Sequence, residues 1–382
     1  MNIKSIKSSV YRHLINIPGW RTNRKIVVIE SDDWGSIRMA SKDAYNYFLS
    51  KGFPVDTCPY NRYDALECNE DLEQLFEVLD SVKDANANSA ILTANAVVAN
   101  PDFKKIKDSG FEKYYYEPFT KTLERYPVHD RVYELYKIGI DKKLIKPQFH
   151  GREHLNVFRW MQSLQSEDKH ARMAFAWRMF SLHTGINSSC RSEYLDAFCV
   201  ESPAEKSALH DIIYDGLTLF TEIMGYMSIS AIAPCYIWNH VAEDVLNECN
   251  VAFFQGALAQ SKPNESKIGL YRKVYHYQGQ RNRHGQQYLV RNAFFEPTSS
   301  DNCDDVDRCL SAIKIAFRLL KPAIISSHRV NYMGYLHPAN RYKSLASLKN
   351  LLESIMKTWP DVEFMSSDQL GSLMLLPESC AE

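Results

Sequence analysis

Short apolar runs rich in β-branched and aromatic residues alternate along the chain with segments in which apolar residues recur every three or four positions. The run KIVVIE at 25–30 is almost continuously apolar, which is typical of a strand buried on both faces of a sheet. Similar runs predict strands at residues 89–98, 144–150, 228–234, 251–256, 288–295, 322–328 and 361–367. Helical spacing predicts helices among them at 69–82, 304–320 and 342–359. This alternation indicates an α/β fold with a parallel sheet, here a barrel related to the (β/α)₈ type, complete or one strand short.

Several segments fall outside a minimal barrel. Residues 1–24 are predicted to be an N-terminal helical segment, and residues 25–376 a single barrel domain. Residues 156–227 form a long insertion of helical pattern, rich in aromatic residues and Met. The insertion is either a helical cap over the functional site or a set of extra helices that enlarges the core. Residues 261–287 are polar and basic, and we expect a loop there, at the carboxyl side of the sheet.

The overall charge is close to neutral. The 382 residues include 45 basic and 46 acidic ones, a net charge of −1, which gives no electrostatic basis for nucleic acid as the main partner. No apolar run reaches about 18 residues, so we expect no membrane span. The nine cysteines include no CxxC pair, and no export signal accompanies them. We therefore expect reduced thiols and a cytoplasmic protein, and nothing in the sequence indicates its oligomeric state.

Carboxylates and imidazoles follow several of the predicted strands directly. Asp32 and Asp33 end the first strand, His150 and His154 follow the third, and His328 ends the seventh. In barrels and open α/β sheets the functional groups lie at the carboxyl ends of the strands, where the loops converge. These five side chains are therefore predicted to lie close together, although they come from distant parts of the sequence.

The spacing of His150 and His154 is suited to a metal site. If the chain turns helical after the strand, residues four apart present both imidazoles on one face. Two imidazoles and one carboxylate make a ligand set for Zn²⁺ or another divalent ion, with positions open for water and substrate. One Asp of the pair could ligate the ion, and the other could act as general base towards a water activated by it. Alternatively, either Asp could cap the following helix.

The order of these motifs resembles that of the polysaccharide deacetylases of the NodB-homology type (carbohydrate esterase family four). The family's Asp-Asp-Gly motif is similar to Ser31-Asp32-Asp33-Trp34-Gly35, its His-Ser/Thr-x-x-His motif to 150–154, and its late strand ending in His to AIISSHRV at 323–330. The resemblance implies a deformed (β/α) barrel and a divalent metal, usually zinc. It implies Asp33, His150 and His154 as ligands, Asp32 as base and His328 as acid. The implied reaction removes an acetyl group from an N-acetylated sugar.

The sequence departs from the family at its third motif, Arg-x-Pro-Tyr. The closest stretch is 232–236, which has Ala at or beside the position of the motif's Arg and contains no Arg. An arginine from another loop, Arg152, Arg291 or Arg329, could replace it, and Glu30 could pair with an arginine such as Arg291 or Arg329. An aromatic residue such as Trp34 could wall the site and stack on a sugar ring. The predicted substrate-binding residues are Trp34, Arg152, Tyr236, Trp238, Arg291 and Arg329.

Two other functions remain open at this level. One is a metal-free glycoside hydrolase on a related barrel, in which Asp32 or Asp33 works with Glu296 or Asp368 across a glycosidic bond. The other is a degenerate, non-catalytic deacetylase that binds a sugar or a partner protein, which the missing arginine favours. A cytoplasmic location would favour a nucleotide-linked or lipid-linked sugar precursor as the carbohydrate.

Overall fold

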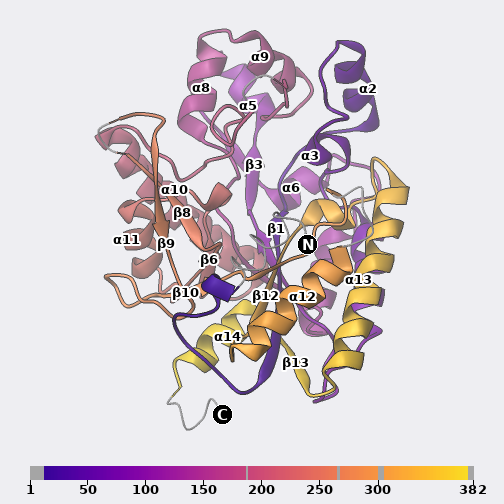
Figure 1. Cartoon of the computed structure of the whole chain (residues 1–382). Helices are drawn as coiled ribbons and strands as arrows, with labels where there is room; N and C mark the ends of the chain where they lie inside the picture. The colour runs from indigo at the N-terminus through magenta and orange to yellow at the C-terminus, as the bar shows by residue number, and fades with distance from the viewer. Residues whose placement is uncertain (1–12, 186–187, 265–266, 300–304, 377–382) are drawn as a thin grey trace.

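The structure is a computed structural model that describes residues 13–185, 188–264, 267–299 and 305–376. Its centre is a nine-stranded sheet in which every recorded strand pair is parallel (Figure 1). The strands are β1 (Lys25–Trp34), β2 (Leu92–Ala96), β5 (Ile145–Phe149), β6 (Ser230–Ile232), β7 (Phe253–Gly256), β10 (Gln287–Val290), β11 (Ala293–Phe294), β12 (Ala323–His328) and β13 (Val362–Met365). Each of the eight predicted strand regions contains at least one of them, because near-continuous burial leaves a strong apolar signal.

One segment closes the sheet into a barrel. The strand order is β10-β7-β6-β5-β2-β1-β12-β11, so β10 and β11 lie at the two ends of the path. Only Arg291 and Asn292 separate these two strands. The single run predicted at 288–295 therefore pairs with β7 through its first half and with β12 through its second half. β13 pairs with the beginning of β1, at Lys25–Val28. The expected deformed α/β barrel is confirmed.

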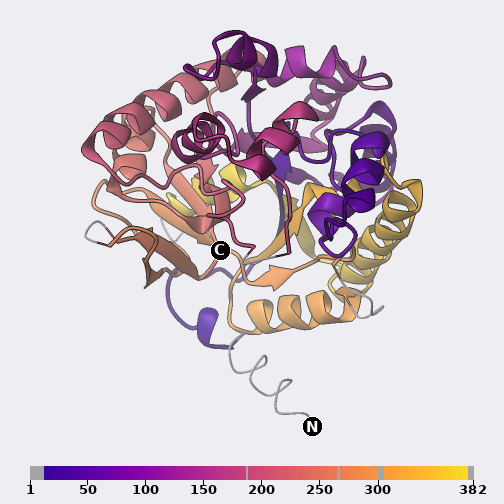
Figure 2. The same ribbon diagram turned by 90° about the horizontal axis from the view of Figure 1, so that it is seen from above.

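Amphipathic helices surround the barrel, as the view from above shows (Figure 2). The long ones are α4 (Asn69–Asp80), α7 (Val132–Asp141), α10 (Pro203–Met224), α11 (His240–Glu248), α12 (Asp305–Arg318) and α13 (Pro338–Thr358). Their apolar faces pack with the outward-facing residues of the strands into one large core. α14 (Ser367–Met374) contributes Leu370 to a second cluster with Ile26 and Val28, whose side chains alternate with those of the first core along β1.

A layer of shorter elements lies above the carboxyl ends of the strands (Figure 1). It contains α2 (Lys42–Ser50), α3 (Pro59–Arg62), α5 (Phe103–Asp108), α8 (Val157–Gln165) and α9 (Lys169–Ala176). Between this layer and the barrel lie the ribbon of β3 (Ala99–Pro101) with β4 (Tyr116–Pro118), and α6 (Phe119–Leu123). The layer has its own apolar centre, which includes Phe103, Trp160 and Phe175.

The segment 156–227, predicted to be an insertion, has two different parts. α8 and α9 belong to the upper layer and are a helical cap. α10, in contrast, packs against β5 and α11 and buries Leu209, Ile213 and Phe220 in the main core. α10 is therefore the barrel helix that connects β5 to β6, and the additional segment ends before it. Helical periodicity is the same in both parts, so the sequence pattern did not separate them.

Two other expectations need correction. The polar segment 261–287, predicted to be a loop, contains most of an antiparallel ribbon of β8 (Ala259–Pro263) and β9 (Tyr271–Tyr275). In the expected N-terminal helical segment, residues 1–12 lie outside the described residues, residues 13–15 are helical and residues 16–24 are not. Within the described ranges, no helix has the length and apolar content needed to cross a membrane.

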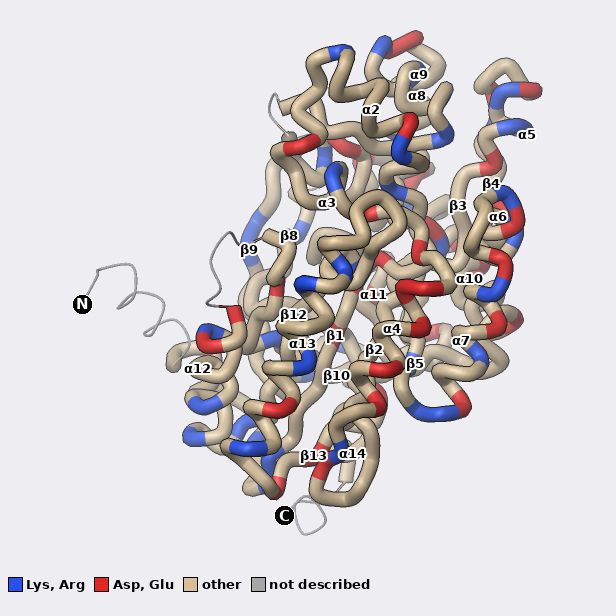
Figure 3. The backbone as a smooth tube through the Cα atoms, turned by 90° about the vertical axis from the view of Figure 1, so that its right-hand side faces the viewer, with Lys and Arg blue, Asp and Glu red and all other residues tan. Residues whose placement is uncertain are grey.

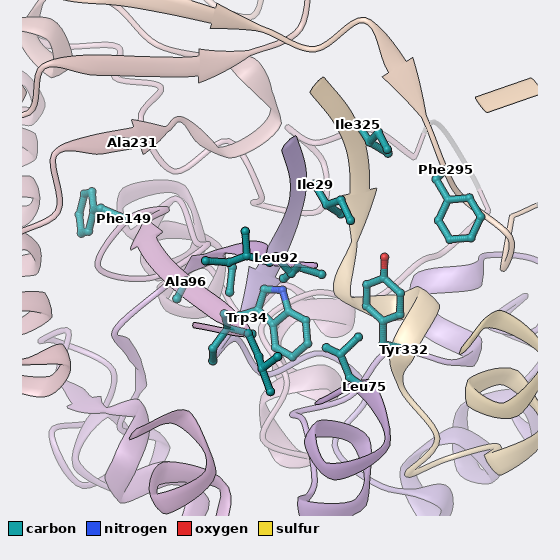
Figure 4. Packing of buried hydrophobic residues seen from close by; sticks show 14 of the residues in the cluster. Ile29, Trp34, Leu75, Leu92, Ala96, Phe149, Ala231, Phe295, Ile325 and Tyr332 are labelled. Carbon is teal, nitrogen blue, oxygen red and sulfur yellow. The ribbon is translucent and has the colours of Figure 1, made fainter. Parts of the chain in front are cut away.

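Trp34 belongs to the main core and does not wall the site. Its side chain is 1% exposed, its ring stacks on Tyr332 with centroids 6.4 Å apart, and its Nε1–H donates to the Ser31 hydroxyl. Figure 4 shows it among Leu75, Leu92 and Tyr332. A sugar cannot stack on a ring enclosed in this way. The predicted substrate role of Trp34 is therefore wrong for this conformation.

Candidate metal centre and active site

The end of β1 changes direction at Asp33. The pairing of β1 with β2 shifts register between Ser31 and Trp34, and Asp33 has φ +77°, in the left-handed region. This conformation costs a non-glycine residue free energy, and such strain is typical of functional positions. As a result, Asp32 and Asp33 point to different partners, Asp32 towards Arg291 and Asp33 towards two histidines.

His150 and His154 lie in an irregular turn and not on a helix. The His150 N–H donates to Ala96 at the end of β2, and Gly151 then adopts φ +118°. The carbonyl of Arg152 accepts the N–H groups of Val98 and Ala99, which fixes the turn to the neighbouring loop. α8 begins only after Asn156. The imidazoles therefore converge through a tight turn, and the helical route that the spacing suggested is not used.

The structure brings Asp33, His150 and His154 together as one buried cluster. One possible ligand atom from each lies within 4.8 Å of the others. Asp33 Oδ1 is 3.4 Å from His150 Nε2 and 3.3 Å from His154 Nε2. The Nδ1 atom of His150 is 3.0 Å from the Ile232 carbonyl, which favours a proton on Nδ1 and a lone pair on Nε2. His150 Nε2 is buried without a hydrogen-bond partner.

The pKa values of His154 and Asp33 are consistent with a site that binds a cation. Burial lowers the pKa of His154 to about 3, against the attraction of Asp33, so this imidazole is neutral and can ligate. Burial opposes ionisation of Asp33, but the neighbouring side chains, the charge of Arg38 among them, outweigh it and hold the Asp33 pKa well below its ordinary value. A carboxylate with two imidazoles is a donor set that a divalent ion such as Zn²⁺ fits.

Arg291 clamps Asp32 from the break between β10 and β11. Its Nη1 and Nη2 atoms donate to the two carboxylate oxygens of Asp32 at 2.7 and 2.6 Å. Its Nε atom donates to Glu30 at 2.6 Å, so one guanidinium holds both acids on the same side of β1. Of the two arginines expected as partners of Glu30, Arg291 and Arg329, it is Arg291 that pairs with it. Arg291 is fully buried, so it positions Asp32 rather than exposing its own guanidinium.

The clamp also sets the charge of Asp32. Burial alone would raise its pKa, but the charge and hydrogen bonds of Arg291 lower the Asp32 pKa to about 2. Asn95 from β2 adds a hydrogen bond to Asp32 Oδ1 at 2.8 Å. Asp32 is therefore an oriented carboxylate immediately beside the cluster of Asp33 and the two histidines.

His328 ends β12 directly opposite Asp32. Its Nε2 atom is 3.8 Å from Asp32 Oδ2, and its Nδ1 atom is 2.6 Å from Glu296 Oε1. Burial would lower the His328 pKa, but Glu296 outweighs it and raises the pKa to about 9. Asn331 donates to the other Glu296 oxygen at 2.7 Å and fixes that carboxylate. His328, with 24% of its side chain exposed, is therefore a positioned, protonated imidazole that solvent can reach.

The other predicted substrate residues are occupied by protein contacts. Arg152 forms an ion pair with Glu153 through two hydrogen bonds and also reaches Asp215 at 3.0 Å. Arg329 is fully buried against Asp64 and Glu67. Both arginines serve the fold around the site, and Arg329 is inaccessible to a substrate.

Of the two predicted aromatic residues after β6, only Tyr236 approaches the site. Its hydroxyl accepts a hydrogen bond from Arg291 at 2.9 Å. Trp238 is 1% exposed and stacks on Phe254 and His276, so its predicted contact with substrate is also wrong for this conformation. After β6, residue type alone did not show which aromatic residue packs in the core, as Trp238 does, and which one approaches the site, as Tyr236 does.

Sequence reasoning overlooked three contributors to this site: Arg38, Tyr60 and Asn95. Arg38 comes shortly after the Asp pair, and its guanidinium lies 5.4 Å from the centre of the Tyr60 ring. The same ring contacts His328 edge-on at 5.5 Å. An arginine so close to a strand-end Asp pair was the available signal for Arg38. Tyr60 and Asn95 carry no comparable pattern. Glu296 had been considered only as a glycosidase acid, and it acts here on His328.

Comparison with known proteins adds little beyond the fold. No known family profile matches the sequence, and no curated protein matches it. A protein from Mycobacterium smegmatis assigned as a polysaccharide deacetylase has a TM-score of 0.44 and 10% identity, over 93% of this chain and 92% of its own. A family 4 carbohydrate esterase from Streptomyces lividans has a TM-score of 0.37 and 9% identity, over 92% and 96%.

The similar structures also include a 4-alpha-glucanotransferase from Thermococcus litoralis, with a TM-score of 0.42 and 10% identity, over 91% of this chain and 40% of its own. These TM-scores are below 0.5, and the names cover different reactions. The similarity therefore decides nothing about activity, which has to be argued from the site itself.

Proposed function

We propose that this protein is a metal-dependent hydrolase that removes an N-linked acyl group, such as acetyl, from a carbohydrate. The observation that carries the proposal is the cluster of Asp33, His150 and His154 directly beside an oriented carboxylate, Asp32, and a proton donor, His328. The order of these motifs along the sequence, which resembles that of polysaccharide deacetylases, supports the same reaction. Zinc as the metal and the cytoplasm as the location stay predictions from the sequence.

The residues divide the chemistry among them. Asp33, His150 and His154 would hold the divalent ion, which when bound supplies a Lewis acid for the acyl carbonyl and lowers the pKa of water. Asp32 accepts the proton of the attacking water, and Arg291 keeps its carboxylate oriented. His328 donates a proton to the departing sugar amine, and Glu296 keeps His328 protonated until then.

A non-enzymatic role is less well supported. The missing third-motif arginine favoured a non-enzymatic role, but Arg291, from the break between β10 and β11, supplies a guanidinium to Asp32. The metal-free glycosidase also loses support. Asp368 is occupied at the start of α14, where it accepts from Ser366, and His328 lies between Glu296 and Asp32. Basic and acidic residues are interspersed along the backbone in Figure 3, which gives no support for nucleic acid as a partner.

Metal analysis of the purified protein is the direct test. We expect about one divalent ion per chain, and its loss in the double variant His150→Ala/His154→Ala. The matched control is His210→Ala, which removes a partly exposed imidazole on α10 that pairs with Glu248 on α11, and it should leave the metal content unchanged. Wild-type protein that binds no divalent ion at neutral pH would rule out the proposed reaction. Release of acetate from N-acetyl-hexosamine oligomers then tests the activity itself.

A further inference from the structure

Arg38 lies at the edge of the site beside the catalytic groups. Its guanidinium packs over Tyr60, whose ring also contacts His328, so one aromatic ring lies next to both side chains. The charge of Arg38 also favours ionisation of Asp33. The Arg38 side chain is 10% exposed and is therefore almost completely removed from water. A buried cation in this position needs a partner.

Among the described residues, Arg38 has no hydrogen-bonded partner. Arg38 Nε is buried without a hydrogen bond, and the one recorded ionic contact of the guanidinium is with Asp64 Oδ2 at 3.6 Å, beyond hydrogen-bond length. The neighbouring buried arginines are very different. Arg291 donates to Glu30, Asp32, Tyr236 and Ser326. Arg329 donates to Asp64 and Glu67.

Nearby acids are already used by other cations. Both oxygens of Asp64 accept from Arg329, at 3.0 and 3.2 Å. Glu193 is 3.0 Å from the His183 Nδ1 atom, and Glu296 is 2.6 Å from His328. Asp33 faces the two histidines of the cluster. The guanidinium of Arg38 therefore donates to none of these acids, because each of them has another partner.

We propose that Arg38 binds a negatively charged group of the substrate, so that the carbohydrate treated by this enzyme is acidic and not neutral. This proposal rests on the proposed function and specifies its substrate class. The planar fork of a guanidinium fits two oxygens of a carboxylate or a phosphate, and the Tyr60 ring holds the fork in place. The sugar class is therefore either a uronic acid or a sugar phosphate, and the shared feature is an oxyanion close to the acylated position.

Binding of simple sugars by the purified protein, measured by isothermal titration, tests the proposal without requiring turnover. The probes are glucuronate, glucose 6-phosphate and glucose. Because a charge-assisted pair is involved, wild type should bind at least one of the anionic sugars about tenfold more tightly than glucose. A preference for glucuronate alone would indicate that the substrate is a uronic acid. A preference for glucose 6-phosphate alone would indicate a sugar phosphate, and a preference for both would indicate that Arg38 recognises the oxyanion that the two share.

The variant Arg38→Gln should abolish this preference. Arg62→Gln is the matched control, since Arg62 also lies over a tyrosine ring, at 4.9 Å from Tyr63, but is exposed. The preference of Arg62→Gln for anionic sugars should equal that of wild type. If Arg38→Gln fails to fold, Arg38→Lys takes its place. It keeps the charge without the fork and should reduce the preference several-fold.

Three results would overturn the role of Arg38: no preference for anionic sugars in wild type, a preference that persists in the Arg38 variant, or an equal loss in Arg62→Gln. A persisting preference would mean that the anion binds elsewhere, for example at the metal. Metal content is measured on the same samples. Protein that contains the metal and releases acetate but shows no preference for anionic sugars would disprove only this inference. Protein that contains no metal but shows an Arg38-dependent preference would disprove only the proposed reaction.

Discussion

Asp32 and His328 are directly opposite each other in the register of β1 and β12, and His328 Nε2 lies 3.8 Å from Asp32 Oδ2. Burial opposes the charged form of both side chains, yet both are charged near neutral pH. Arg291 lowers the Asp32 pKa to about 2, and Glu296 raises the His328 pKa to about 9. Two titratable groups with pKa values pushed apart in this way are suited to accept and to donate a proton, as the proposed function requires.

Asp32→Asn should therefore remove activity and keep the metal. The amide cannot accept a proton, so acetate release should fall by about 100-fold or more. Divalent metal content should stay near the wild-type value, because Asp33, His150 and His154 are unchanged. Asp368→Asn, at the start of α14, is the control and should alter neither quantity. Loss of the metal together with activity would instead place Asp32 among the ligands.

The pair of His328 and Glu296 predicts a pH dependence. The His328 pKa is raised from 6.5 to about 9, so the pair's contribution to stability is fully present below pH 6.5 and is lost as the pH rises through about 9. Activity that needs the His328 proton should fall over the same alkaline range. In Glu296→Gln the main cause of the raised pKa is absent, so the alkaline limit of activity should move to lower pH.

A pH–rate profile of the two proteins checks this prediction. Glu77→Gln, an exposed substitution on α4, is the matched control and should keep the wild-type profile. An unchanged alkaline limit in Glu296→Gln would show that another group supplies the proton.

Arg291→Met should destabilise the protein most at neutral and alkaline pH. Removing one partner of a buried ion pair typically costs about 3–5 kcal/mol, since the remaining charges stay buried. Burial already raises the pKa of Glu30 in the wild type, and without the arginine the pKa of Glu30 should rise further and that of Asp32 should rise as well. The variant should therefore recover stability as the pH falls from 8 to 5 and these acids take up protons. Wild-type Asp32, with its pKa of about 2, shows no such recovery.

Denaturant unfolding across this pH range measures the effect. Arg62→Met removes an exposed arginine and should cost little at any pH. A deficit in Arg291→Met that stays constant with pH would contradict the burial of unpaired acids as its cause.

Gly151 tests whether the tight turn, rather than a helix, brings the histidines together. Its φ of +118° disfavours a side chain, and an added Cβ would lie 3.1 Å from the Glu153 carbonyl oxygen. Gly151→Ala should therefore displace the imidazoles and weaken divalent-metal affinity by about tenfold or more, as loss of ligand support does elsewhere. Gly52→Ala is the matched control, because Gly52 also has positive φ, at +82°, with nothing within 4 Å of the added Cβ. It should lose some stability and no metal affinity.

The sequence was informative wherever one local pattern determined the outcome. The barrel strands have near-continuous apolar runs because they are buried on both faces, and polar residues at their ends therefore stood out as Asp32, Asp33, His150, His154 and His328. The structure brings these five side chains to one end of the barrel.

Features that depend on tertiary packing were not predictable in this way. The split of one predicted strand into β10 and β11 follows from barrel closure, and it places Arg291 at the break. Arg38 lacks a hydrogen-bonded acid because Arg329 occupies both oxygens of Asp64, a contact between residues 265 positions apart. No local pattern along the chain carries such information.

Trp34 provides the last test, because its position in the core makes it a structural residue despite its place beside the Asp pair. Trp34→Phe removes the hydrogen bond to Ser31 and part of the packing on Tyr332, and it should lower the free energy of unfolding by about 1–3 kcal/mol. The KM for an acetylated oligosaccharide should not change, since the ring is enclosed. Thermal unfolding and steady-state kinetics on the same samples separate the two roles. A raised KM with unchanged stability would instead mean that the ring leaves the core to meet the sugar.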